Sequence, residues 1–465
     1  MEHSVHSDRQ AYRVVITRRD ASEILLEKTG SSYSLPVIVV LRSERIVAQL
    51  NRLALSKWNL QTYCLWVRRP DPGDPNVSDG CAIFDTCGPS ADLPEGTLWR
   101  SVEGLDRRGD RLAVGITEMA WQALATLGSV ESTQSSGPFS RPGWIRQLSD
   151  WIRNQIHPLG HRLTGEFQQL SGDSCACLIR FETTGPAMWF KAGGATNARE
   201  FQITSILARL FRESLPPIVA IHPEWNGWLT QDVSGVTLDQ VNDVTVWERV
   251  AKKLAELQIA CVDSRLALLR EGCRDASVQT LRQHIGPFLD HLENSADRQR
   301  NGISQDLGRP EFAFVADALD DCCTGLQQVA LPDTIVHLDF NFGNLIYSEG
   351  ACVFLDWAEA AIGNPLTTFE YLRELAKRGH TRGYGLFVRI NAAYLRPWHA
   401  VVSPVNLAKA FAYSPLIAVF TFALACDRWG EQPTERSPEQ VRFLQSLSRR
   451  MYRESLRLRN SPCAA

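Results

Sequence analysis

Four polar residues that could carry chemistry lie in "IVHLDFNFGNLIYSEGACVFLDW" (335–357): His337, Asp339, Asn344 and Asp356. Carboxylate and amide oxygens are ligands that Mg²⁺ prefers, and this ion keeps several waters and binds substrate phosphates as well. With Asn344 and Asp356 as metal ligands, Asp339 is left to accept a proton from an attacking hydroxyl. This division of roles is typical of phosphoryl transfer.

The elements around these residues must bring them together. "TIVHLDF" is typical of a buried strand, and "NLIYSEGACVFLDW" predicts a hairpin with a Ser-Glu-Gly turn. The two outer ends of a hairpin meet, so we expect Asn344 and Asp356 to be neighbours, with Asp339 on the loop just before them. The alternative is that these side chains only make turn bonds and cap a strand.

"HLDFNFGNLI" and "VFLDWAEAAIGNP" together resemble the aminoglycoside phosphotransferase and choline kinase family of small-molecule kinases. The sequence departs from the family pattern in three places: Leu338 replaces a glycine, Asn341 a common histidine, and Asn364 the aspartate of Gly-Asp-Pro. The resemblance implies Asp339 as the catalytic base, Asn344 and Asp356 as Mg²⁺ ligands, and His337 as a residue that orders the loop. It covers about two thirds of the chain and implies a protein-kinase-like fold.

A cation for the nucleotide phosphates is also needed. Lys191 ends the strand-like "AMWFK", and Glu200 follows nine positions later in a predicted helix. A Lys–Glu pair between a strand and a helix holds the ammonium toward the α- and β-phosphates of ATP in kinases. Glu213 is a rival partner, but it lies near the far end of that helix.

Two further segments could contact the nucleotide. "LSGDSCACL" (170–178) has one glycine; Ser171, Gly172 and Ser174 could present N–H groups and hydroxyls to phosphate, and an ordinary hairpin turn is the alternative. "WLTQDVSG" (228–235) predicts an extended hinge, in which Asp232 and Val233 are the candidates for contacts with adenine. Gly235 would let the chain turn into the helical part.

The composition excludes some classes of protein. The chain has 465 residues, a formal net charge of −3, 44% hydrophobic residues and twelve cysteines without zinc-type spacing. The small net charge gives no reason to expect nucleic acid or a membrane as partner. The N-terminus has no apolar core typical of a signal peptide, and "PLIAVFTFALAC" (415–426) predicts a buried helix. We therefore expect a cytoplasmic protein with reduced thiols.

The chain is predicted to be α+β and to have four parts. Residues 1–130 form an accessory α/β domain, 131–143 a Ser/Pro/Gly-rich linker, 144–235 a β-rich lobe with the hinge, and 236–465 a mostly helical lobe with the loop 337–344. The first part weakly resembles a Nudix-type fold. Its predicted helix, 43–58, has a single acid, Glu44, so we expect a non-hydrolysing relative with a gating, docking, dimerising or purely structural role.

These observations predict an ATP- or GTP-dependent, Mg²⁺-dependent phosphotransferase acting on a hydroxyl of a small molecule such as an aminoglycoside, choline or a sugar. The alternative is a nucleotide-binding pseudokinase whose N-terminal domain contacts a protein. Glu359, Glu370 and Glu374 follow the metal aspartate and could line a pocket for a cationic amine, or they could be surface charges on a helix. The sequence does not indicate the oligomeric state.

Overall fold

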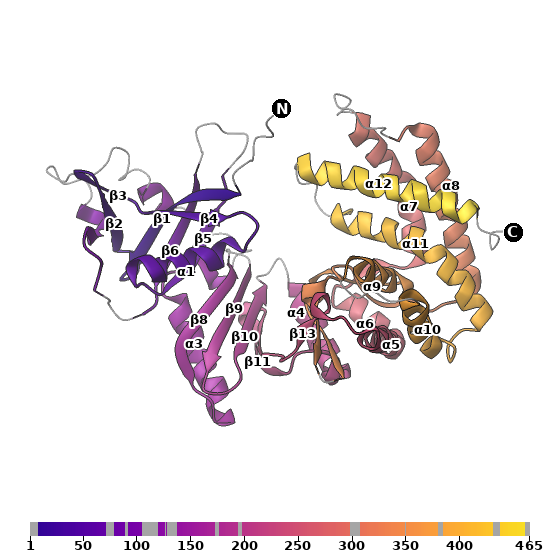
Figure 1. Cartoon of the computed structure of the whole chain (residues 1–465), viewed down its shortest axis with the longest axis horizontal. Coiled ribbons are helices and arrows are strands. Elements are labelled where there is room, and N and C mark those ends of the chain that lie inside the picture. The colour runs from indigo at the N-terminus through magenta and orange to yellow at the C-terminus, as the bar shows by residue number, and fades with distance from the viewer. Residues whose placement is uncertain are drawn as a thin grey trace. The chain divides into compact units, whose positions relative to one another are not determined.

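The computed structural model describes the chain except for residues 1–7, 71–78, 89–91, 105–119, 126, 128–136, 173–175, 194–197, 298–306, 349, 380–384, 431–437 and 461–465. The chain divides into two compact units (Figure 1). The first unit comprises Met1–Phe201 with Pro217–Asp232, and the second comprises Gln202–Pro216 with Val233–Ala465.

The first unit begins with a mixed sheet, here called the N-terminal sheet. Its strands run in the order β3-β2-β1-β6-β5, with β4 beside β1 and β7 beside β2. Apolar side chains on both faces bury the central strand, so Val14 and Val15 are both 0–1% exposed although they point to opposite faces. The strands are β1 Arg9–Arg18, β2 Glu23–Thr29, β3 Ser32–Ser34, β4 Val37–Leu41, β5 Thr62–Arg68, β6 Gly80–Thr86 and β7 Thr97–Ser101.

Helix α1 (Ile46–Trp58) covers one face of this sheet with Val47, Leu50, Ala54 and Trp58. It begins at Ile46, later than the predicted 43, so Glu44 precedes it instead of standing on it. Glu44 lies 3.7 Å from Arg52 in an exposed ion pair. The resemblance of this part to a Nudix-type fold stays a prediction.

A second sheet follows, in the antiparallel order β11-β12-β10-β9-β8. It is here called the β8–β12 sheet. It carries β8 Leu163–Gly172, β9 Ala176–Thr183, β10 Met188–Gly193, β11 Ile218–His222 and β12 Gly227–Gln231. Helix α3 (Trp144–Ile156) precedes it, and α4 (Ala198–Leu210) begins after β10.

The two sheets of the first unit share one hydrophobic core. Trp144 at the start of α3 lies at its centre, with its ring 5.6 Å from that of Tyr63 in β5 and 6.2 Å from that of Phe190 in β10. The core continues through both sheets and α3, and includes Val15, Ile24, Leu65, Ile83, Phe139, Leu148, Ile152, Ile179, Phe181 and Met188. The part predicted to be an accessory domain therefore packs into the same core as the predicted β-rich lobe, and so does Phe139 from the predicted linker.

The second unit is mostly helical. Its helices are α5 Val244–Cys261, α6 Arg265–Arg270, α7 Val278–Asp297, α8 Arg309–Val329, α9 Leu366–Arg378, α10 Leu386–Trp398, α11 Pro404–Cys426 and α12 Pro438–Arg459. Helix α11 is long and apolar enough to cross a membrane, but 61% of its most apolar window is buried inside the unit. The expected α+β class, with a β-rich lobe before a mostly helical one, is confirmed.

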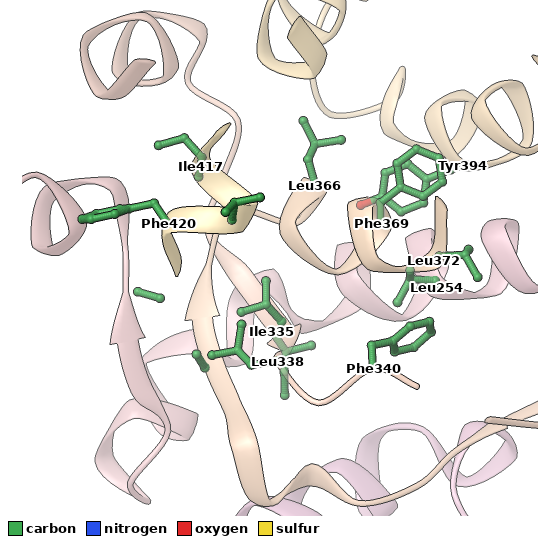
Figure 2. Packing of buried hydrophobic residues seen from close by; sticks show 14 of the residues in the cluster. Leu254, Ile335, Leu338, Phe340, Leu366, Phe369, Leu372, Tyr394, Ile417 and Phe420 are labelled. Carbon is green, nitrogen blue, oxygen red and sulfur yellow. The ribbon is translucent and has the colours of Figure 1, made fainter. Parts of the chain in front are cut away.

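Two short sheets interrupt these helices. One has the order β13-β16-β17 and the other β14-β18-β15. Their strands are β13 Val236–Thr237, β14 Arg274–Ala276, β15 Thr334–His337, β16 Leu345–Ser348, β17 Ala351–Phe354 and β18 Ala360–Gly363. Figure 2 shows how Ile335 and Leu338 are buried near Leu366 of α9 and Ile417 of α11. The strand β15 is thus fixed from several helices, and the loop that follows it begins from a rigid base.

Candidate active site

The predicted hairpin is confirmed in the second unit. Leu345 pairs with Phe354 and Ser348 with Ala351, which makes β16 and β17 antiparallel neighbours. At the open end, the Leu355 N–H donates to the Asn344 carbonyl at 2.8 Å. Asn344 therefore lies opposite the residue that precedes Asp356, as the hairpin argument requires.

In the loop between β15 and β16, two asparagine side chains bind the Asp339 carboxylate. The Asn344 side-chain amide donates to the Asp339 carboxylate at 3.2 Å and to its backbone carbonyl at 2.9 Å. The amide of Asn341 donates to the other carboxylate oxygen at 3.1 Å. Because Asn344 uses its Nδ2 toward Asp339, its Oδ1 points elsewhere and is the atom with which it could hold a cation.

Asp356 stands in an unusual backbone conformation. Its φ of 59° and ψ of 71° are in the left-handed region, which costs energy for a residue with a Cβ. Such conformations persist at sites where a side chain must be aimed in a fixed direction. The 3₁₀ turn Trp357–Glu359 begins immediately afterwards and leads into β18.

His337 is buried at the end of β15 and is bound from two sides. Its ring Nε2–H donates to the Leu355 carbonyl at 2.8 Å, and its backbone N–H donates to the Thr368 hydroxyl at 2.8 Å. The ring therefore connects the residue before Asp356 to the strand before Asp339. This is consistent with the predicted role in ordering the loop.

Gln258 was missed by the sequence analysis. It is fully buried in α5, and its amide donates to the carbonyls of Ile335 and Pro365, each at 3.1 Å, and accepts from the Tyr394 hydroxyl at 2.7 Å. It therefore fixes the strand before the loop and the chain after β18. The available signal was a polar residue four positions after Leu254, on the apolar face of α5.

In the first unit, Lys191 and Glu200 form the predicted pair. Lys191 Nζ lies 2.5 Å from Glu200 Oε1, and Glu200 is 2% exposed. The rival Glu213 is exposed in a 3₁₀ turn. Ser171 pairs with Leu178, which in turn pairs with Lys191, so these three side chains stand on the same face of the β8–β12 sheet.

The other predicted nucleotide contacts have mixed outcomes. Gly172 ends β8 opposite Cys177, but Ser174 lies outside the described residues. The Asp232 carboxylate accepts from the Trp189 indole at 2.7 Å and from Arg180 at 3.3 Å, and its N–H donates to the Ala187 carbonyl. The backbone N–H of Asp232 is therefore already used, and within the predicted hinge this leaves Val233 as the better candidate for an adenine contact.

Gly235 is required for a steric reason. A Cβ at this position would lie 2.5 Å from the carbonyl oxygen of Tyr347 in β16, and its φ is 156°. The close approach lets β13 pair with β16, so the hinge segment continues into the hairpin sheet of the second unit.

For the acids after Asp356, the expectation was a pocket for a cationic amine or a set of surface charges, and Glu370 fits neither. Glu370 is neither a surface charge nor open to a ligand: it is 4% exposed and bound by Arg373 and the Ser414 hydroxyl. Glu374 pairs with Lys377 and Arg450. Glu359 is half-buried and lies 3.1 Å from Arg274.

A thiol lies near the loop but is unreactive. Burial, followed by the negative charges of Glu359 and Asp339, raises the pKa of Cys426 to about 12. The Cys426 thiol is therefore neutral near pH 7, and only thiolates are strong nucleophiles.

Comparison with known proteins shows what part of the chain is similar to a known family. Residues 197–396 match the model of the phosphotransferase enzyme family. No curated protein matches. Among solved structures, choline kinase from Cryptosporidium parvum shares 13% identity with a TM-score of 0.45, over 68% of this chain and 95% of that chain. An ethanolamine kinase from Plasmodium vivax shares 11% identity with a TM-score of 0.43, over 71% of this chain and 93% of that chain. A macrolide 2′-phosphotransferase from Brachybacterium faecium shares 13% (0.43; 65% and 97%).

The three TM-scores are below 0.5, so the assignment rests on the family model and on the loop that it contains. The likeness to the phosphotransferase enzyme family therefore lies in residues 197–396, which are less than half of the chain.

Proposed function

We propose that the protein transfers the γ-phosphoryl group of ATP, or of GTP, to a hydroxyl group of a small molecule, with Mg²⁺ bound. The new bond joins the acceptor oxygen to phosphorus, and the bond between phosphorus and the β–γ bridging oxygen breaks. The nucleoside diphosphate leaves with that electron pair, and the hydroxyl proton passes to the enzyme. The protein's contribution in such reactions is mainly positioning and charge neutralisation.

In the first unit, Lys191 binds the α- and β-phosphates. The buried Glu200 holds the ammonium in place, so little orientational freedom is lost when a nucleotide binds. Ser171 stands on the same face and donates its hydroxyl to a phosphate oxygen, and the N–H group of Gly172 next to it contributes in the same way. Val233, with Asp232 beside it, contacts the base through the backbone.

In the second unit, Asn344 and Asp356 are suited to hold Mg²⁺. Both supply hard oxygen atoms, and the hairpin brings their backbones together. Among the residues that the structure describes, no group of three or more His, Cys, Asp or Glu side chains is placed to hold a metal ion. An ion bound by these two residues would complete its shell with phosphate oxygens and water, as Mg²⁺ commonly does; it would neutralise charge on the phosphates.

Asp339 accepts the proton of the acceptor hydroxyl. The amides of Asn341 and Asn344 hold the two carboxylate oxygens and fix the direction of the group, and its side chain is exposed to an incoming substrate. Of all the observations, this orientation of Asp339 by Asn344 carries the proposal. The hydrogen bond links Asp339, the proposed base, to Asn344, a proposed metal ligand. Separate turn bonds made by each residue would not link the two.

The proposal is tested with Asp339→Asn, which keeps the shape and removes the base. We expect phosphoryl transfer to fall by about 10²–10⁴-fold, because this is the usual contribution of general base catalysis. ATP binding should change little. Turnover is measured by mass spectrometry of a panel of hydroxyl compounds incubated with ATP and Mg²⁺, and binding by calorimetry.

Asp321→Asn is the matched control, since Asp321 is exposed on α8. Unchanged turnover in Asp339→Asn contradicts the assignment of the base. If the natural protein binds ATP but phosphorylates none of the compounds in the panel, the pseudokinase alternative is favoured instead.

A further inference from the structure

Gln169 in β8 joins the two sheets of the first unit by hydrogen bonds. It is 1% exposed. Its Oε1 accepts from the Cys64 N–H at 2.7 Å and from the Asn51 amide at 3.1 Å, and its Nε2 donates to the Cys64 carbonyl at 2.9 Å. The Thr62 hydroxyl in turn donates to Asn51 at 2.7 Å. Gln169 is thus bound to a strand and, through Asn51, to helix α1.

The amide takes the place of a neighbouring strand. β5 is the last strand in the order of the N-terminal sheet, so its outer backbone groups have no strand partner within that sheet. Gln169 satisfies both the N–H and the C=O of Cys64, as the peptide group of an adjacent strand would do. This buried side chain therefore helps to fix the position of β8 along β5, together with the Gln61 amide, which donates to the Gly165 carbonyl at 2.9 Å.

Directly after Gln169, β8 has a bulge. Gln169 pairs with Ile179, but Ser171 pairs with Leu178, so Leu170 is an extra residue. In an uninterrupted strand, Gln169 and Ser171 would point to the same face, the one that packs into the shared core. The bulge moves Ser171 to the opposite face, where Lys191 stands opposite Leu178.

We infer that Gln169 is a positioning residue, which ties the bulge to the N-terminal sheet and so turns Ser171 toward the phosphate-binding face that carries Lys191. The N-terminal sheet is then part of the nucleotide-binding apparatus, because it supplies the backbone to which β8 is fixed. This inference rests on the proposed function for the identity of the ligand, ATP. It adds a role for the N-terminal sheet that the family match, residues 197–396, does not include.

The test uses the full chain and the variant Gln169→Met, which keeps length and approximate volume and removes the hydrogen bonds. The control is Thr17→Val: the Thr17 hydroxyl is also fully buried and donates to the Phe84 carbonyl at 2.9 Å, but within the N-terminal sheet. Both variants lose buried polar contacts to a backbone, so both should be less stable. We expect the dissociation constant for ATP with Mg²⁺, measured by calorimetry, to rise about fivefold or more in Gln169→Met only.

Coupling to Ser171 separates positioning from general destabilisation. If Gln169 acts through Ser171, the loss of affinity in Gln169→Met with Ser171→Ala should be smaller than the product of the two single losses, by about threefold or more. Hydrogen exchange of the peptide that contains residues 170–172 should be faster in Gln169→Met than in Thr17→Val. Should Gln169→Met not fold, Asn51→Ala removes one of the three bonds and is expected to show the same effects at smaller size.

Three outcomes overturn the inference. The first is natural ATP affinity in a folded Gln169→Met or Asn51→Ala variant, and the second is a loss of affinity in Gln169→Met with Ser171→Ala that equals the product of the two single losses. The third is an equal loss of ATP affinity in Thr17→Val. A natural protein that does not bind ATP contradicts the proposed function instead. In that case the exchange measurement at 170–172 still decides whether Gln169 holds the bulge.

Discussion

At the scale of single residues, the loop after β15 is organised around one carboxylate. Asp339 accepts hydrogen bonds from Asn341 and Asn344, both within five positions in the sequence. Contacts over such short separations depend on the local backbone, and the short loop 338–344 between a buried strand and a hairpin fixes that backbone. Asp356 reaches the same region only because the hairpin returns the chain to Asn344.

The backbone of Asp356 leads to a prediction that separates stability from function. Asn tolerates the left-handed region better than most residues with a Cβ, and it has nearly the shape of Asp. We expect Asp356→Asn to melt within about 3 °C of the natural protein, because the conformational cost does not increase. Its Mg²⁺-dependent ATP binding should be strongly reduced, since a neutral amide binds a divalent cation less well. Calorimetric titrations with and without Mg²⁺ measure this; equal Mg²⁺ dependence in both proteins would contradict the ligand role.

A second prediction concerns pH. Burial, followed by the negative charge of Asp275, raises the pKa of Asp333 to about 6, against the opposing effect of Arg265. Because the folded pKa is above the unfolded value, this carboxyl favours folding below the unfolded pKa, and the contribution is lost as the pH rises toward 6. Asp333→Asn does not titrate, so it should be more stable than the natural protein at pH 7.5, by roughly 1–2 kcal/mol. Urea denaturation should show this difference shrinking as the pH falls to about 4; the same difference at both pH values would show another cause.

At the scale of elements, Gln258 connects α5 to the strand that carries the loop. Its two carbonyl partners, Ile335 and Pro365, precede the loop and follow β18, respectively, and Tyr394 comes from α10. Tyr394 is itself fixed by ring stacking on Phe369 of α9, with 3.9 Å between the ring centroids (Figure 2). One buried amide therefore sets the spacing of several elements around the loop.

Replacing Gln258 by Leu should destabilise the second unit. The change leaves two carbonyls and a hydroxyl buried without their partner, so we expect a loss of about 2–4 kcal/mol in the free energy of unfolding. Tyr394→Phe removes one of these bonds and should cost about 1 kcal/mol. Since both residues belong to one network, the double variant should lose less than the sum of the two. Guanidinium denaturation measures all three; additive losses would show that Gln258 and Tyr394 act independently.

What the sequence could predict at this scale follows from how far apart the partners are. The hairpin was predicted from a turn between two strand-like runs, all within a short stretch of sequence. Gln258 and Gln169 were not, because their partners lie 77 to 136 and 105 to 118 positions away and no local pattern indicates them. Glu370 has one partner close in the sequence, Arg373, and one that no local pattern indicates, Ser414, which is 44 positions away.

At the scale of the whole molecule, the N-terminal sheet differs from what its sequence suggested. Its sequence predicts a separate domain, because strand-like runs and a helix are followed by a Ser/Pro/Gly-rich stretch. In the structure, Tyr63 and Leu65 of β5 share a core with Trp144 of α3 and Phe190 of β10. A sequence pattern shows that a strand face is apolar but does not show which other face covers it.

This shared core predicts that the N-terminal sheet cannot be separated from the β8–β12 sheet. If a protease site is inserted in the segment 131–136 and cut in the folded protein, the two fragments should remain associated, because parting them would expose Trp144, Ile179 and Phe181 to water. Gel filtration in native buffer should then show one species at the full mass, and denaturant should release both fragments. The same site inserted in 431–437 is the control for the effect of a cut as such. Elution of the N-terminal fragment by itself would mean that this part is a docking module after all, and it would also remove the backbone partner on which the assigned role of Gln169 depends.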